Sequence, residues 1–321
     1  MSTSALGIHH VTAIASDPQR NVDFYAGTLG LRMVKRTVNF DDPKTYHFYY
    51  GDEAGTPGSI LTFFPWPGAR RGRQGVGQAA VTSLAVPPES LGWWIERLVA
   101  HGVEHERPSR RFGAPVLAFR DPDGLLLELT VHPDAASRGA WEGADVPAEH
   151  AIRGVHSVAL WEEAGEETVR MLTDTLGFRH VADEGNVSRF AAGDGGPGTL
   201  VDVRTVGGFP RGAGGAGTVH HVAWRTGDDA GELELRARAE AAGAQPTPVI
   251  DREYFHSVYF REPGGVLFEL ATDAPGFDVD EPRERLGEAL MLPPQYEPRR
   301  AEIERVLPAF HLPGTLPVEG R

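Results

Sequence analysis

Cysteine is absent from this chain of 321 residues. Its absence excludes disulfide bonds, thiolate metal ligands and a cysteine nucleophile, and it fits the cytoplasm, where we expect the protein to be located. No apolar run is long enough to cross a bilayer. The first residues, Met-Ser-Thr-Ser-Ala-Leu, lack the basic and apolar regions of a secretion signal. We therefore expect neither membrane insertion nor export.

Positive charge is also scarce. The chain has 31 Lys and Arg residues against 45 Asp and Glu residues, which gives a formal net charge of -14. Nucleic-acid phosphates require a basic face, so we expect no nucleic-acid partner and attribute the acidity to solubility. Hydrophobic residues make up 40% and charged residues 24%, as in an ordinary globular protein, and the length suggests two domains.

The chain contains an internal repeat of roughly 65–75 residues, which is longer than solenoid periods and indicates duplicated modules. The first copy predicts a strand, a helix that begins after Asp17 and ends near Gly30, and three further strands. The predicted strands of this copy are 8–14, 32–37, 46–50 and 59–64. Copies one and three share Thr-Leu-Gly at the end of the helix, and copies two and four share a proline turn before the last strand.

We therefore predict an α+β protein in which four βαβββ modules form two curved-sheet, half-barrel domains, followed by a C-terminal helical tail. The modules are expected at residues 1–75, 76–135, 153–212 and 213–273, with a linker at 136–152 and a C-terminal strap at 274–321. The pattern also predicts three helices in the last part of the chain: Glu232–Ala242, Glu284–Met291 and Arg299–Val306.

Two histidine pairs stand at the heads of predicted strands, His9-His10 in the first module and His220-His221 in the fourth. Glu269 follows in an apolar strand of the fourth module. Two imidazoles and one carboxylate suit non-haem Fe(II) and leave open positions for substrate and O₂. A single strand histidine is usually a hydrogen-bonded core residue, but the recurrence of the pair favours a metal site.

The repeat allows equivalent positions to be compared within one chain. At the second histidine of the pair, the four copies carry His10, Ala80, Ser157 and His221. At the carboxylate position of the last strand they carry Thr62, Glu128, Asp202 and Glu269. Only the first and fourth copies therefore offer an imidazole at this position, and we interpret Glu128 as a structural residue or as a relic of the duplication.

Strand phase selects one histidine of each pair, because successive strand residues face opposite sides of a sheet. His10 shares its face with Thr12, and Glu269 can point away from the apolar layer. We therefore predict a metal cleft between the first and fourth modules. The competing arrangement pairs the third module with the fourth and uses His156.

A family resemblance is carried by six segments: Ile8–Thr12, Asn39–Asp42, Tyr46–Glu53, Gly55–Pro65, Val219–Val222 and Asp251–Arg261. Together with the βαβββ repeat, they resemble the vicinal oxygen chelate superfamily of glyoxalases, bleomycin-resistance proteins and extradiol dioxygenases. The chain is most similar to its hydroquinone ring-cleaving dioxygenases, the group of 2,6-dichlorohydroquinone dioxygenase and the MhqO-type proteins. The resemblance covers most of the chain.

The resemblance implies a ring-cleaving dioxygenase that acts on hydroquinone-type aromatics with O₂ and uses Fe(II), with Mn(II) as the alternative metal. It places the metal ligands at His10, His221 and Glu269. It places the residues that support these ligands or contact the substrate at His9, Thr12, His220, Arg252 and Tyr259. His9, His220 and Tyr259 are the candidate bases for a phenolic proton.

Arg252 is the candidate for stabilising negative charge on the substrate or on oxygen. The alternative for Arg252 is a surface ion pair with Asp251 or Glu253. Tyr254 and Phe255 would form an aromatic wall, or simply pack in the core.

Three other functions stay open at this point. A glyoxalase-like isomerase needs a fourth ligand, usually a carboxylate, where the first module has Thr62. A metal-free binding or drug-resistance protein would not need the three ligands. A catechol extradiol dioxygenase uses the same ligands and is the nearest alternative. The sequence leaves open the ring substituents and the oligomeric state, a homo-oligomer included.

Overall fold

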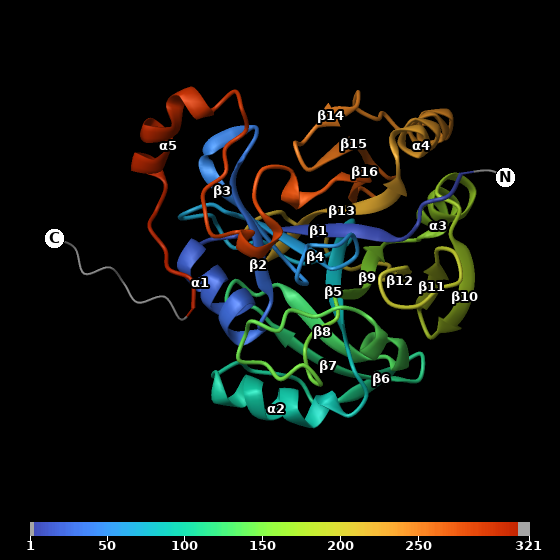
Figure 1. Cartoon of the computed structure of the whole chain (residues 1–321). Coiled ribbons are helices and arrows are strands. Elements are labelled where there is room, and N and C mark those ends of the chain that lie inside the picture. Colours follow the sequence, from blue (N-terminus) through green and yellow to red (C-terminus); the bar gives the residue numbers. More distant parts are fainter. Residues whose placement is uncertain (1–2, 314–321) are drawn as a thin grey trace.

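Two sheets of eight strands each dominate the computed structural model, which describes residues 3–313 (Figure 1). The first sheet has the order β14 (Ile250–Asp251), β15 (Phe255–Arg261), β16 (Leu267–Pro275), β13 (Thr218–Gly227), β1 (Ile8–Ala15), β4 (Ile60–Pro65), β3 (Asp42–Gly51) and β2 (Arg32–Asn39). The second has the order β10 (Arg179–Glu184), β11 (Val187–Ala191), β12 (Leu200–Thr205), β9 (Val155–Glu162), β5 (Gln78–Val86), β8 (Leu126–Val131), β7 (Ala114–Arg120) and β6 (Ser109–Arg111).

Helices connect the first and second strands of each module. The α-helices are α1 (Pro18–Val22), α2 (Ser90–Ala100), α3 (Glu166–Arg170), α4 (Asp229–Ala241) and α5 (Arg300–Val306). Two π-helical turns, η1 (Asp23–Thr28) and η3 (Met171–Thr175), continue α1 and α3. The 3-10 helices are η2 (Pro133–Ser137), η4 (Phe277–Val279), η5 (Arg283–Arg285) and η6 (Glu297–Arg299). The chain thus repeats a strand, a helix and three strands four times, which confirms the α+β prediction.

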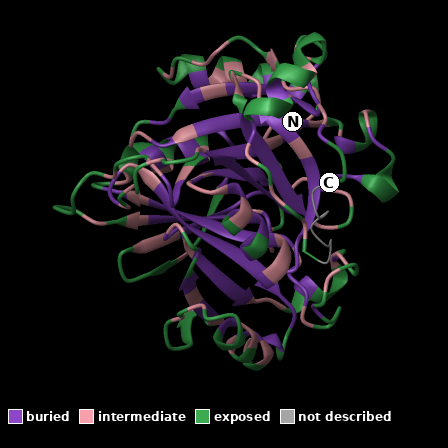
Figure 2. Cartoon of the chain, turned by 90° about the vertical axis from the view of Figure 1, so that its left-hand side faces the viewer, coloured by how far each residue is buried: buried purple, intermediate pink, exposed green. Residues whose placement is uncertain are grey.

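Local signals in the sequence explain where the helices begin and end. The Asp17 carboxylate accepts a hydrogen bond from the Arg20 amide at 2.9 Å, as an N-cap residue does, and Pro18 follows at the first helical position. After α2 the chain turns at Gly102, where φ is +70° and a side chain would be strained. Figure 2 shows the buried residues concentrated in the strands and the exposed ones in helices and loops.

The first and fourth modules meet in the middle of the first sheet. Strand β1 pairs with β13 in the antiparallel direction, and each of them also pairs in parallel with the last strand of its own module, β4 or β16. Strands β5 and β9 form the corresponding centre of the second sheet. Residues of the first and fourth modules therefore share one concave face, whereas His156, on β9, belongs to the other sheet.

Some predicted elements are wrong in detail. The segment Glu284–Met291 is not a helix: within it the structure has the end of η5, followed by turns and a bridge between Leu290 and Arg36. Helix α4 begins at Asp229 rather than Glu232, because Asp228 accepts a hydrogen bond from the Gly231 amide and caps the helix earlier. Helix α5 lies within the predicted range Arg299–Val306.

The segment after β16 packs along β2 and β3 (Figure 1). Buried Lys35 of β2 donates hydrogen bonds to Asp280 and Glu281 at 2.5 Å each, and the Tyr296 hydroxyl donates to the Phe40 carbonyl at 2.7 Å. The part of the predicted strap at 314–321 lies outside the described residues. Between residues 3 and 313, no helix has both the length and the apolar character needed to cross a membrane.

Candidate metal centre

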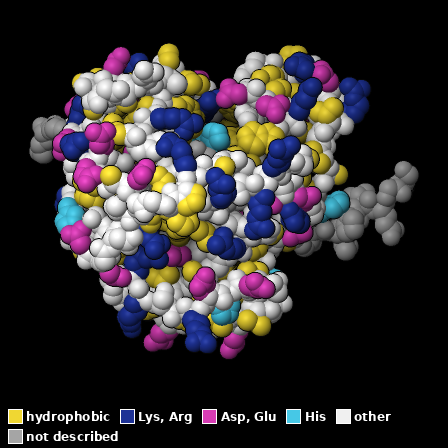
Figure 3. Space-filling model, turned by 180° about the vertical axis from the view of Figure 1, so that it is seen from behind, with side chains coloured by type: hydrophobic (Ala, Val, Ile, Leu, Met, Phe, Trp, Pro, Cys, Tyr) yellow, Lys and Arg dark blue, Asp and Glu magenta, His cyan; other side chains and the backbone are white. Residues whose placement is uncertain are grey.

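A cavity of about 450 Å³ opens on the concave face of the first sheet. Its lining comes from strands of the first and fourth modules and from the loops beside them: His10, Asn39, Phe40, Asp41, His47, Tyr49, Phe64, Trp66, His220, His221, Thr247, Ile250, Arg252, Phe255, Tyr259 and Leu267. The face of the molecule seen in Figure 3 is hollowed near its upper edge, with a histidine and several basic side chains beside the hollow.

Two β-bulges aim the histidines. From Ile8 to His10, β1 advances two residues while β13 advances one, so His9 is the extra residue of a bulge. A few residues on, β13 advances from His221 to Val219 while β1 advances one residue, which makes His220 the extra residue of a second bulge. Bulges disturb the strict alternation of a strand and re-aim side chains. They allow the two imidazoles of each pair to contact each other, although the two residues are adjacent on one strand.

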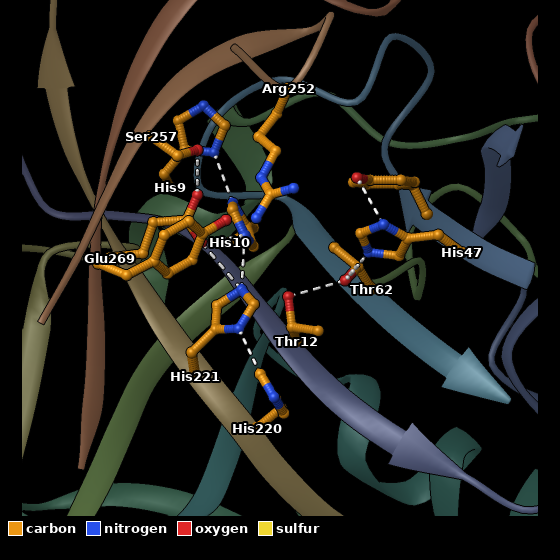
Figure 4. A network of polar contacts seen from close by, with 12 residues as sticks. His9, His10, Thr12, His47, Thr62, His220, His221, Arg252, Ser257 and Glu269 are labelled. Carbon is orange, nitrogen blue, oxygen red and sulfur yellow. Dashed lines mark hydrogen bonds and ion pairs between the residues drawn. The ribbon is translucent and has the colours of Figure 1, made fainter. Parts of the chain in front are cut away.

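Three buried side chains, His10, His221 and Glu269, meet beside the cavity, and the two histidines line it (Figure 4). One ligand atom from each of His10, His221 and Glu269 can be chosen so that all lie within 4.8 Å of one another. The two Nε2 atoms are 3.3 Å apart, and the Glu269 Oε2 atom lies 3.2 Å from that of His10 and 2.9 Å from that of His221. The exposed fractions of the three residues are 2%, 4% and 0%.

The donor set fits a divalent cation. Glu269 Oε2 is buried and, among the described residues, accepts no hydrogen bond, although it faces two imidazole nitrogens. A buried polar atom without a partner is costly, and a cation between the three atoms would remove that cost. Two imidazoles and a carboxylate are also the ligand types preferred by divalent iron and manganese. The described residues thus contain a group that could hold a metal ion.

Neighbouring side chains orient the three residues. Nδ1 of His10 lies 3.0 Å from Nδ1 of His9, and Nδ1 of His221 lies 2.8 Å from that of His220. Each short contact requires one ring to donate and the other to accept. The Ser257 hydroxyl donates to Glu269 Oε1 at 2.5 Å, which leaves Oε2 facing the two imidazoles.

The protonation states suit metal binding. Burial lowers the pKa of His221, so its imidazole is neutral. Burial alone would raise the pKa of Glu269, but the neighbouring His10 and His221 bring it well below its usual value, so the carboxylate is ionised. A neutral imidazole at His221 and an ionised carboxylate at Glu269 are forms that coordinate a cation.

Of the remaining predicted residues, Arg252, Tyr259 and His220 line the cavity, whereas His9 and Thr12 do not. The Arg252 guanidinium lies over the Tyr259 ring, 5.3 Å from its centroid, and pairs with Asp41 at 3.2 Å. Its ionic partner is therefore neither Asp251 nor Glu253, as the surface alternative expected. Phe255 forms part of the cavity wall, but Tyr254 is outside this cavity.

The second sheet corrects one position of the repeat comparison. From Ala79 to Val81, β5 advances two residues while β9 advances one, so Ala80 is the bulged residue and corresponds to His9, not to His10. The equivalent of His10 is Val81. The sequence does not reveal the bulge at Ala80, and the bulge shifted the comparison of the repeat copies by one residue. The carboxylate positions hold, because Thr12–Thr62, Ser83–Glu128, Ala159–Asp202 and Ala223–Glu269 are equivalent Cα partners.

Ion pairs occupy the corresponding positions of the second sheet. Arg111 donates to Glu128 at 2.7 Å, and Arg189 donates to both oxygens of Asp202 at 2.7 and 2.8 Å. The interpretation of Glu128 as a structural residue agrees with this pairing. Neither carboxylate faces an imidazole pair.

Sequence reasoning missed roles for His47, Tyr49 and Ser257. His47 and Tyr49 line the cavity, and Ser257 holds Glu269. The signal that could have found His47 and Tyr49 is the alternation of β3, since Tyr46, Phe48 and Tyr50 point to the other face. Ser257 carries no such signal, because a serine in a strand is common and its partner is recognisable only in three dimensions.

Residues 7–129 and 154–270 match the family described as the Glyoxalase/Bleomycin resistance protein/Dioxygenase superfamily. The chain belongs to this superfamily. It is 46% identical to MhqO of Bacillus subtilis (strain 168), a provisionally named ring-cleaving dioxygenase, over 97% of this chain and 99% of that protein. It is 35% identical to the chlorohydroquinone/hydroquinone 1,2-dioxygenase of Sphingobium indicum, over 94% of this chain and 95% of that protein.

A solved superfamily structure agrees with the fold. The crystal structure of a provisionally named dioxygenase from Bacillus subtilis superposes with a TM-score of 0.93 at 45% identity, covering 97% of this chain and 99% of that chain. The predicted membership of the vicinal oxygen chelate superfamily and the predicted fold are both confirmed.

Proposed function

We propose that the protein is a ring-cleaving dioxygenase that acts on hydroquinone-type aromatics with O₂ and uses Fe(II) bound by His10, His221 and Glu269. The observation that carries this proposal is the buried group of three ligand atoms beside an aromatic-lined cavity of about 450 Å³. The dioxygenase names of the relatives support the reaction class, and the Sphingobium indicum enzyme is named for hydroquinone substrates. The metal cleft lies between the first and fourth modules.

Iron at this position would supply the one-electron chemistry that O₂ requires and would bring a phenolate oxygen and O₂ side by side. His10, His221 and Glu269 would hold the iron, and the group of possible ligands found among the described residues has no fourth member. The fourth-ligand position expected of an isomerase is held by Thr62, whose hydroxyl hydrogen bonds to Thr12 at 2.8 Å. This contact favours a dioxygenase over a glyoxalase-like isomerase.

The histidine pairs set the proton positions. A ligand imidazole that binds through Nε2 carries its proton on Nδ1. His10 then donates to Nδ1 of His9, and His221 donates to Nδ1 of His220. His220 keeps its own proton on Nε2, so it is a hydrogen-bond donor for an oxygen atom in the cavity. His9 is the acceptor that fixes the His10 ring.

The same geometry narrows the candidate bases. Burial, followed by the charge of Glu269, raises the pKa of Tyr259 well above its usual value, so Tyr259 stays protonated. His9 is outside the cavity, and His220 already accepts a hydrogen bond at Nδ1. None of the three is therefore a free proton acceptor, and the phenolic proton would leave to solvent water. Arg252, which lines the cavity, would lower the pKa of the phenol, as a bound cation would.

The test is O₂ uptake after anaerobic loading with Fe(II), measured with a panel of hydroquinones and catechols. The proposal predicts uptake with hydroquinones. Uptake with catechols alone would refute the substrate class and favour an extradiol enzyme. Protein that binds neither iron nor manganese would refute the enzyme and favour a metal-free binding protein.

A further inference from the structure

The buried polar side chains that line the cavity fall into two sets. Among the described residues, one set is the ligand pair His10 and His221, and the other is His47 and Tyr49 on β3. His47 and Tyr49 are 9% and 2% exposed. Apolar rings, including Phe64 and Phe255, complete the deep wall. The buried polar side chains of the lining thus form two groups, with apolar rings and less buried polar side chains such as Arg252 and Tyr259 around them.

A hydrogen-bonded chain runs through the second set. The Tyr49 hydroxyl lies 2.9 Å from Nδ1 of His47, and Nε2 of His47 lies 2.8 Å from the Thr62 hydroxyl. Thr62 in turn lies 2.8 Å from the Thr12 hydroxyl. Both ring nitrogens of His47 are therefore engaged, so the imidazole holds Tyr49 rather than contacting a ligand itself.

The two sets stand on different strands of one sheet. Thr12 of β1 faces His221 of β13 as a Cα partner, Thr62 of β4 faces Thr12, and Tyr49 of β3 faces Thr62. Strand β3 is two strands from β1, which corresponds to about 10 Å along a sheet. Figure 4 shows the same order, with Thr12 and Thr62 between His221 and His47.

We propose that Tyr49, held by His47, recognises the substrate hydroxyl that lies para to the oxygen directed at His10, His221 and Glu269. The inference rests on the proposed function and deepens it by assigning the choice between para and ortho diols to named residues. A hydroquinone carries its two oxygens at opposite ends of an apolar ring, as the two groups of buried polar side chains require. A catechol carries both at one end and leaves Tyr49 without a partner.

Tyr49 can bind that substrate oxygen whether or not it carries a proton, because the donors and acceptors in the Tyr49–His47–Thr62 hydrogen bonds can all be exchanged. When Tyr49 donates to His47, His47 donates to Thr62 and the phenolic oxygen of Tyr49 accepts from a substrate hydroxyl. When Thr62 donates to His47, His47 donates to Tyr49 and the Tyr49 hydroxyl donates to a substrate oxygen. Neutral imidazole allows both arrangements, and burial keeps His47 neutral by lowering its pKa.

The test compares Tyr49→Phe with Tyr50→Phe. Tyr50 is the next residue on β3, is equally buried, and donates its hydroxyl to Asn21 at 3.0 Å on the side away from the cavity. Dissociation constants for hydroquinone, catechol and phenol are measured without oxygen on Fe(II)-loaded protein, together with the iron content. Phenol has only one oxygen, the one directed at the metal, so its affinity does not depend on a contact with Tyr49.

Tyr49→Phe is expected to weaken hydroquinone binding about fivefold to tenfold, the effect of one neutral hydrogen bond, while phenol and catechol binding and iron content stay unchanged. Tyr50→Phe should leave the ratio of hydroquinone to phenol affinity unchanged. An equal loss for all three ligands, or no loss for hydroquinone, would overturn the inference. If the wild type itself binds no hydroquinone, the proposed function fails together with the inference.

His47 is a positioning residue. Its variants show whether Tyr49 needs the hydrogen bond from residue 47 or only a side chain that fills the space. An asparagine side chain is too short to reach Thr62, but its amide lies near the place of Nδ1, so His47→Asn should retain most of the preference for hydroquinone over phenol. His47→Leu keeps an apolar side chain and should lose that preference to the level of Tyr49→Phe. A preference retained in His47→Leu would show that Tyr49 needs no positioning and would overturn this part.

Discussion

The Nε2 atoms of His10 and His221 lie 3.3 Å apart, although 211 positions separate these residues along the chain. Strands β1 and β13 bring them together, and Glu269 Oε2 faces both. Glu269 Oε2 is buried and has no hydrogen-bond partner among the described residues. A divalent cation would engage all three atoms.

Removal of one proposed ligand should abolish metal binding. His10→Gln is expected to weaken Fe(II) binding by more than about 100-fold. This loss is larger than that typical of mutating a residue that only supports a metal ligand. The matched control is His156→Gln, a buried histidine at a bulge in the second sheet, which should leave affinity unchanged. Equilibrium dialysis with metal analysis measures both. Loss of metal in His156→Gln alone would overturn the pairing of the first and fourth modules.

The Ser257 hydroxyl should matter through the Glu269 carboxylate that it holds. Ser257→Ala is expected to weaken metal binding about tenfold, because the carboxylate loses the hydrogen bond that fixes Oε1. Ser83→Ala is the control, since Ser83 is equally buried and hydrogen bonds to Thr130 in the second sheet. Equal affinities in the two variants would contradict an orienting role for Ser257.

Glu232 should make stability depend on pH. This residue of α4 is fully buried without a hydrogen-bond partner among the described residues, and burial raises its pKa from 4.5 to about 7. A carboxyl group with a raised pKa contributes stability that is complete below pH 4.5 and is lost as the pH rises through about 7. Glu232→Gln should therefore stabilise the protein at pH 8, by about 1–3 kcal/mol, and not at pH 4.

Urea unfolding at the two pH values measures this difference. Glu240→Gln on the same helix is the control, because its carboxylate is 62% exposed and pairs with Arg236 only at 3.5 Å. If both variants change the free energy of unfolding equally, burial of Glu232 is not the cause.

The ion pair between Arg189 and Asp202 should support the fold and not the metal. Both residues are buried, and Asp202→Asn leaves the guanidinium without its counter-charge. The expected loss is about 3 kcal/mol in the free energy of unfolding, with metal affinity unchanged. Reduced metal binding in a variant of unchanged stability would instead assign the second sheet a part in the site.

Strand periodicity and the internal repeat predicted the βαβββ order that the structure shows, and they favoured His10 and Glu269 as ligands over their neighbours, because one face of each strand is apolar. Periodicity could not reveal the bulges at His9 and Ala80, since an inserted residue leaves composition unchanged. It also could not reveal that Ser257 holds Glu269, because their hydrogen bond joins adjacent strands. The prediction of a helix at Glu284–Met291 is wrong for a different reason: the segment has helical composition, but its contacts with β2 determine its path.

The most direct test of the central claim is the fate of ¹⁸O₂ during turnover of hydroquinone by Fe(II)-loaded protein. Cleavage by a dioxygenase predicts a ring-opened product that carries two ¹⁸O atoms at early times, and no such product from Glu269→Gln. Formation of benzoquinone without ¹⁸O, with O₂ reduced to peroxide, would contradict ring cleavage.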